Sequence, residues 1–126
     1  MNTIKISDAE WQVMKIIWRK NPVQAKDIIQ LISQVQDWKP KTIKSLISRL
    51  VKKKAIAFKE ENRIYQYFPI ITEKEYLQLE RKKFLEKTYN GSSLSLITAF
   101  INDSQFSKEE IEELKLLLEK NKKVDR

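Results

Sequence analysis

The chain has 126 residues, with 25 Lys and Arg against 17 Asp and Glu, no Cys, no His and a single Gly. This length suffices for one ordinary domain or two small ones. Without Cys or His the chain cannot form a structural zinc site, a disulfide framework or a Cys–His catalytic couple, and a lone Gly excludes a glycine-rich phosphate loop. We therefore expect no cofactor and no metal, and an enzyme is the most remote class of function.

The positive charge is unevenly distributed along the chain. Residues 1–71 hold 14 Lys and Arg against 6 Asp and Glu, a net charge of +8, whereas residues 72–126 hold 11 of each. A basic domain favours a polyanionic partner, and nucleic acid comes before an anionic membrane surface. No apolar run is long enough to span a bilayer, and no secretory signal pattern is present. We expect a cytoplasmic protein that does not bind membranes.

Two amphipathic helices are predicted first. Ser7 and Glu10 have the spacing of a capping box, in which both side chains bond backbone N–H groups at the start of a helix. Apolar residues then recur at helical spacing up to Asn21, which precedes a proline and so disfavours helix. A second apolar stripe runs over residues 25–35 and predicts the second helix.

A third helix and a hairpin complete the first half. Pro40 suits the first turn of a helix, and the apolar residues after it share one face: Ile43, Leu46, Ile47 and Leu50. Residues 56–59 and 64–68 are rich in β-branched and aromatic types, and residues 60–63 between them are polar. This pattern indicates a β-hairpin. Three helices followed by a hairpin predict a winged helix-turn-helix DNA-binding domain over residues 1–71.

The second half, residues 72–126, predicts three more helices at about 73–88, 94–103 and 108–121, with a clear break at 90–93. The fold class is therefore mainly α, or α+β. Three short helices are too few for an independent core, so we expect a helical dimerisation domain that packs against a second copy of the chain. The apolar residues expected at that interface are Leu77, Phe84, Leu94, Ile97, Phe100, Ile101, Ile111, Leu114 and Leu118.

The polar face of the third helix carries the candidate DNA contacts. At 3.6 residues per turn, Lys and Ser side chains gather opposite the apolar stripe. Such donors suit a helix in the major groove, where base edges and phosphates offer acceptors. The predicted base readers are Lys41, Thr42, Lys44 and Ser45, the predicted phosphate contacts are Arg49, Lys52, Lys53 and Arg63, and Lys39 and Ser48 complete the predicted DNA-binding set.

Two alternatives stay open for this basic half. A Lys-rich helix face is often only solvated, and a winged helix also serves as a non-catalytic protein–protein adaptor. The position of the basic helix, between two short helices and a hairpin, favours DNA. Arg63 in the turn is a candidate phosphate contact, but Glu60 and Glu61 next to it in the sequence repel the DNA backbone. Salt-dependent retention on DNA distinguishes a DNA-binding protein from an adaptor.

Aromatic residues are frequent in the first half and have two interpretations. They serve either as core residues or as stacking platforms for single-stranded nucleic acid. Helical or alternate-strand spacing favours the core. This prediction covers Trp11, Trp18, Tyr65, Tyr67 and Phe68, and Trp38 is expected to brace the start of the third helix.

Two long segments carry motifs that are specific enough to compare with known families. Residues 6–18 read ISDAEWQVMKIIW, and residues 40–50 read PKTIKSLISRL. Both resemble the penicillinase repressor family of Gram-positive bacteria, the BlaI and MecI type. The similarity continues through residues 89–91, 95–96 and 109–114, so it covers nearly the whole chain.

The resemblance implies a homodimeric transcriptional repressor whose winged-helix heads read an inverted-repeat operator. In such repressors of β-lactam resistance, a membrane sensor linked to a protease starts induction, and the repressor is cut within its dimerisation helices. The matching bond here joins Ala99 to Phe100, whereas the family's bond joins Asn to Phe, and Lys39 stands where relatives often carry a Ser helix cap. A repressor of this family that answers an unrelated signal stays the alternative. A copper-responsive relative is disfavoured because the chain has no Cys pair.

Overall fold

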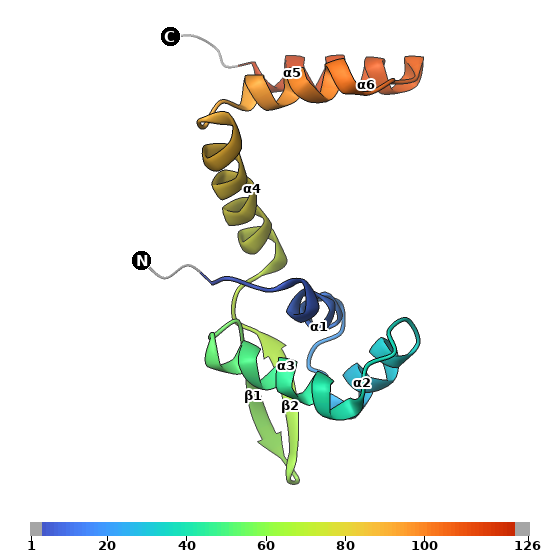
Figure 1. Ribbon diagram of the computed structural model, residues 1–126, viewed down its shortest axis with the longest axis vertical. Helices are drawn as coiled ribbons and strands as arrows, with labels where there is room; N and C mark the ends of the chain where they lie inside the picture. The colour runs from blue at the N-terminus through green and yellow to red at the C-terminus, as the bar shows by residue number, and fades with distance from the viewer. Residues whose placement is uncertain (1–3, 123–126) are drawn as a thin grey trace. The chain divides into compact units, whose positions relative to one another are not determined.

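The structure, a computed structural model, describes residues 4–122. It divides into two compact units, of which the first ends at Leu79 and the second begins at Glu80. Figure 1 shows the helices of the first unit gathered together, with the β-hairpin projecting from them. In this described part the chain is mainly helical and carries a two-stranded sheet, which confirms the predicted fold class.

Crossing a bilayer requires a long, apolar helix. Within residues 4–122, no helix combines the necessary length and apolar character.

The first unit begins with α1 (Asp8–Arg19), α2 (Ala25–Ser33) and α3 (Pro40–Lys52). The predicted capping box starts α1. The Ser7 hydroxyl accepts from the N–H of Glu10 at 3.1 Å, and the Glu10 carboxylate accepts from the N–H of Ser7 at 2.9 Å. Two backbone donors that the first turn leaves without helical acceptors are thereby satisfied.

The second helix is shorter than the apolar pattern predicts. It ends at Ser33, and Val35 is 73% exposed instead of lying on the apolar face. The N–H groups of Gln34 and Val35 bond to carbonyls three residues back. Such bonds tighten the last turn, and Val35 consequently points away from the core.

The hairpin consists of β1 (Ile56–Glu61) and β2 (Ile64–Pro69), which pair antiparallel. Its turn contains two residues, Asn62 and Arg63, instead of the predicted four at 60–63, because β1 continues to Glu61. Both turn residues have positive φ, 52° and 66°. This backbone is that of a type I′ turn, whose twist matches that of a hairpin.

The hydrophobic core of the first unit lies between the three helices and β1. Every one of these elements contributes fully buried side chains, because each helix has one apolar face. The largest are Val13, Met14 and Ile17 of α1, Ile28 and Ile32 of α2, Ile43 and Leu50 of α3, and Ile56 of β1. Half-buried Trp38, just before α3, packs against this core.

An aromatic cluster joins α1 to the start of α4 (Glu73–Tyr89). The ring centroids of Trp11 and Trp18 lie 5.4 Å apart, and both rings contact Tyr76, at 5.7 and 5.9 Å. The Trp18 indole N–H also donates to the carbonyl of Ile71 at 2.9 Å. Since Tyr76 is buried, the first turns of α4 belong to the first unit, and the boundary falls after Leu79 instead of at Thr72.

The core prediction is wrong for Tyr65. Trp11, Trp18, Tyr67 and Phe68 are half-buried, but Tyr65 is 42% exposed and stacks on Phe58 with ring centroids 4.1 Å apart. Tyr65 lies opposite Glu60, next to the tip of the hairpin. Alternate spacing predicts which face of a strand a side chain occupies, but it does not predict how far the hairpin extends beyond the helices.

The second unit contains the rest of α4, α5 (Ser93–Asp103) and α6 (Lys108–Asn121). Asn90 and Gly91 end α4 with positive φ angles of 52° and 81°, and the N–H of Gly91 bonds back to the carbonyl of Leu85 at 3.0 Å. Ser107 and Glu110 form a second capping box. None of the side chains of residues 80–122 is buried within the single chain.

Candidate nucleic-acid interface

The two faces of α3 differ in burial and chemistry. Its first residue is Pro40, and Lys39 before it provides no side-chain cap. Ile43, Leu46, Ile47 and Leu50 are buried. The predicted DNA-binding residues of this helix are all exposed, and they lie within about 160° of arc around the helix axis. They are Lys41, Thr42, Lys44, Ser45, Ser48, Arg49 and Lys52. The helix therefore presents a continuous row of hydrogen-bond donors, four of them cationic, to solvent.

Lys53 differs from its neighbours at the end of α3. Its ammonium nitrogen lies 2.5 Å from Oε1 of Glu10 and donates to the carbonyl of Lys5 at 2.6 Å. The sequence predicted a phosphate contact for Lys53, but this charge is already neutralised inside the first unit. We therefore leave Lys53 out of the interface.

Glu10 is the partner that the sequence did not reveal. Its side chain is 2% exposed. Burial alone raises the pKa of this carboxyl, but hydrogen bonds from Lys53 and Ser7, together with the charge of Lys53, lower it below its ordinary value. A capping box predicts only a bond to the helix start. The contact with Lys53 joins residues 43 positions apart and leaves no local signal in the sequence.

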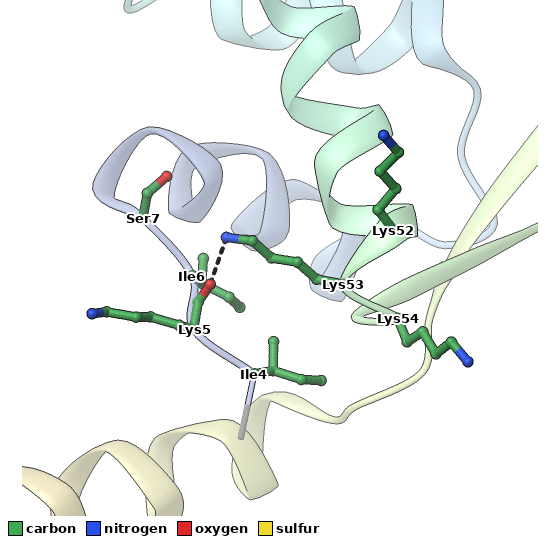
Figure 2. A pocket seen from close by; sticks show the side chains of 7 residues that line it. All are labelled: Ile4, Lys5, Ile6, Ser7, Lys52, Lys53 and Lys54. Atoms are coloured by element: carbon green, nitrogen blue, oxygen red, sulfur yellow. Dashed lines mark hydrogen bonds between the residues drawn. The ribbon is translucent and has the colours of Figure 1, made fainter. Parts of the chain in front are cut away.

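A hollow of about 790 Å³ lies between the end of α3 and the residues before α1. It is lined by Ile4, Lys5, Ile6, Ser7, Lys52, Lys53 and Lys54. Figure 2 shows that Lys53 reaches across it to the backbone of Lys5, whereas Lys52 and Lys54 extend in other directions. Because these ammonium groups diverge, the hollow is not a convergent site for a small anion.

The β1–β2 hairpin is the wing of the winged helix, and it carries Arg63 at its tip. Arg63 is exposed in the two-residue turn, and Glu60 and Glu61 beside it are exposed as well. The exposed rings of Phe58 and Tyr65 stack behind this tip, and Tyr67 meets both rings edge-on. The wing therefore combines one cation with an exposed aromatic surface formed by Phe58 and Tyr65.

The predicted dimerisation residues are exposed along the helices of the second unit, except Leu77, which is half-buried and belongs to the first unit. Ala99 and Phe100 lie inside α5, where Ala99 is half-buried and Phe100 is 59% exposed. Among residues 4–122, no three acidic side chains gather as they would around a metal ion.

The sequence model of the family described as penicillinase repressor matches residues 6–120. The methicillin resistance regulatory protein MecI of Staphylococcus aureus (strain N315) is 43% identical over 118 residues, covering 94% of this chain and 96% of the relative. The penicillinase repressor of Bacillus licheniformis is 39% identical over 118 residues, covering 94% of this chain and 92% of the relative.

Two solved structures resemble the first part of the chain. The DNA-binding domain of the repressor BlaI is 40% identical, with a TM-score of 0.54, and the match covers 60% of this chain and 94% of that domain. The monomeric form of Bacillus licheniformis BlaI in complex with the blaP half-operator gives a TM-score of 0.53 at the same identity and coverage. With a family match over residues 6–120 and relatives about 40% identical along more than nine-tenths of their length, the chain belongs to the penicillinase repressor family.

Proposed function

We propose that this protein is a transcriptional repressor that binds double-stranded DNA in the cytoplasm, with α3 in the major groove. The observation that carries the proposal is the exposed row of donors on α3, opposite a fully buried apolar face. In a helix-turn-helix the second helix of the motif enters the groove with its N-terminal residues nearest the bases. The relative whose structure includes a half-operator is 40% identical over this same part of the chain.

The proposed interface divides between base and phosphate contacts. Residues in the first turns of α3 read base edges, and cations farther along the helix and at the wing tip contact phosphates. The proposed base readers are Lys41, Thr42, Lys44 and Ser45, and the proposed phosphate contacts are Arg49, Lys52 and Arg63, with Lys39 and Ser48 at the edge of the same surface.

Fluorescence anisotropy with two labelled duplexes tests this proposal. One duplex carries the blaP half-operator, and the other has the same composition in scrambled order. We expect Ser45→Ala to weaken binding to the half-operator by about fivefold, the effect of one lost hydrogen bond, and to leave the scrambled duplex unchanged. Ser104→Ala, in the second unit, is the matched control. Equal binding of the wild-type protein to both duplexes would contradict sequence-specific recognition.

We propose further that the second unit holds the repressor as a homodimer. The supporting observation is its apolar surface: Phe84, Leu94, Ile97, Phe100, Ile101, Ile111, Leu114 and Leu118 are all exposed in the single chain. A monomer rarely leaves so many apolar side chains in water. Joining two heads makes the second half-site contact intramolecular, which raises affinity for a full operator by about 10²- to 10⁴-fold.

Sedimentation equilibrium on the full chain tests the dimer. We expect Phe100→Asp to raise the dimer dissociation constant at least about tenfold, because it places a charge in an apolar interface. Val35→Asp, an equally drastic change at an exposed apolar position of the first unit, is expected to leave dimerisation unchanged. A wild-type chain that sediments as a monomer would contradict the dimer.

Relief of repression by a sensor-linked protease is the third part of the proposal. The candidate bond between Ala99 and Phe100 lies in the interior of α5. A helical backbone keeps its carbonyls in hydrogen bonds, so we expect the helix to unfold locally before the bond enters a protease. Mass spectrometry of the repressor from cells exposed to a β-lactam tests this step, because cleavage there yields a fragment that ends at Ala99. An intact chain in cells that nevertheless induce their β-lactamase would refute it.

A further inference from the structure

A second, smaller hollow lies between α3, β2 and the start of α2. Its volume is about 260 Å³, and it is lined by Ala25, Lys44, Ile47, Ser48 and Tyr67. Ala25 and Ile47 are apolar, so the lining residues that carry polar side-chain groups are Lys44, Ser48 and Tyr67. No acidic residue lines it.

Tyr67 is held in place from two sides. Its backbone pairs with that of Val23 through N–H···O bonds of 3.0 and 2.8 Å, which tie β2 to the segment between α1 and α2. Its ring meets Phe58 at 5.8 Å and Tyr65 at 6.2 Å, both edge-on. The ring orientation is thus fixed before any ligand binds, which reduces the entropy lost on binding.

The Tyr67 hydroxyl is available as a donor. None of the hydrogen bonds between residues 4–122 involves it. Burial, and to a smaller extent the neighbouring Tyr65 phenol, raise the pKa of Tyr67 above its ordinary value of 10.0. The hydroxyl is therefore protonated at neutral pH, and an oxyanion is the acceptor that suits a set of neutral and cationic donors.

The start of α2 also lines this hollow. Ala25 is the first residue of α2, and the side chain of Gln24 does not cap the helix. The first N–H groups of a helix have no acceptor within it. Three elements thus bring residues with different kinds of hydrogen-bond donor to one hollow that α3 also lines.

We propose that this hollow binds one backbone phosphate of the DNA at the edge of the major groove, and that the Tyr67 hydroxyl donates a hydrogen bond to it. The inference rests on the proposed DNA-binding function and extends it to a residue that the sequence assigned to the core. Lys44 then contacts this phosphate as well, so the base readers reduce to Lys41, Thr42 and Ser45.

Tyr67→Phe removes only the hydroxyl, and Tyr65→Phe is the matched control, because Tyr65 does not line the hollow. Anisotropy titrations use the blaP half-operator duplex and its scrambled counterpart. We expect Tyr67→Phe to bind both duplexes about tenfold more weakly, since a bond to a charged group is lost and phosphate contacts carry no sequence information. The salt dependence of binding is expected to stay unchanged, because a neutral phenol releases no counterion. Tyr65→Phe is expected to match the wild-type protein.

Half-operator duplexes with a single neutral methylphosphonate at successive positions locate the phosphate. At one position the loss of affinity should be smaller for Tyr67→Phe than for the wild-type protein, because Lys44 is then the only one of the two side chains that still contacts this phosphate. Three results would overturn the inference and leave the proposed function standing. In the first, the losses from the methylphosphonate and from Tyr67→Phe are additive at every position. In the second, Tyr67→Phe binds as tightly as the wild-type protein, and in the third, it loses affinity for the half-operator duplex alone. A wild-type protein that binds neither duplex would overturn both. Thermal unfolding of Tyr67→Phe confirms that the variant is folded.

Discussion

Replacing Lys53 by Met removes the ammonium that pairs with Glu10 and keeps most of the aliphatic side chain. The Glu10 carboxylate, 2% exposed, then retains the hydrogen bond from the N–H of Ser7 at 2.9 Å but loses its counter-charge. Breaking a fully buried pair costs about 3–5 kcal/mol, and losing a surface pair costs about 0–1 kcal/mol. Because the Lys53 side chain is 35% exposed, water can reach the gap, and we expect a loss of about 2 kcal/mol.

Urea unfolding followed by tryptophan fluorescence measures this loss. All three Trp residues lie in the first unit, so their emission reports the unfolding of that unit even if the second unit melts separately. Lys52→Met is the matched control. Lys52 is exposed and makes none of the ion pairs found among residues 4–122, so its replacement should change the free energy of unfolding by less than about 0.5 kcal/mol.

The pH dependence of the same measurement identifies the pair. The pKa of Glu10 in the folded state is lowered from 4.5, so ionised Glu10 stabilises the fold above that pH. This stabilisation is lost as pH falls through the folded pKa. The difference between the wild-type protein and Lys53→Met should therefore be full at pH 7 and shrink below about pH 4.5. Equal stabilities of Lys53→Met and Lys52→Met at pH 7, or a difference independent of pH, would refute the reasoning.

Two further predictions concern DNA binding and the aromatic cluster. Lys52→Met should reduce the slope of log affinity against log salt concentration on any duplex by about 1. Lys53→Met, measured under conditions in which the variant is folded, should keep the wild-type slope. An equal reduction of the slope in both variants would return Lys53 to the interface. Trp18→Phe should lower the free energy of unfolding of the first unit by about 1 kcal/mol in urea, because the carbonyl of Ile71 loses its indole donor; unchanged stability would show that water replaces that bond at no cost.

The elements of the first unit were predictable because their signals are local. Ser7 and Glu10 mark the start of α1 through a spacing of three residues, and Pro40 marks the start of α3. The apolar stripe of α3 separates its buried face from its exposed donors by helical periodicity alone. Hence the candidate groove-binding face could be located from the sequence.

The features that the sequence did not reveal involve contacts between distant segments. Lys53 looks like its neighbours in the sequence, and only the docking of α1 beside the end of α3 gives its ammonium a buried partner. Tyr65 and Tyr67 lie on the same face of β2 and have the same side chain, yet Tyr67 is half-buried and Tyr65 is exposed. The first compact unit extends to Leu79 because Tyr76 packs on Trp11 and Trp18, which lie far from it in the chain.

Local patterns in the sequence are sufficient to predict the order of the elements, the concentration of positive charge in the first half, and the family. All of these depend on residue type and on spacing within a few turns or a few strand positions. The packing of the folded unit establishes which charges are already paired and which aromatic residue lines a hollow beside α3. Burial and electrostatic pairing depend on distance in space, and the sequence encodes that distance only through the packing of the whole unit.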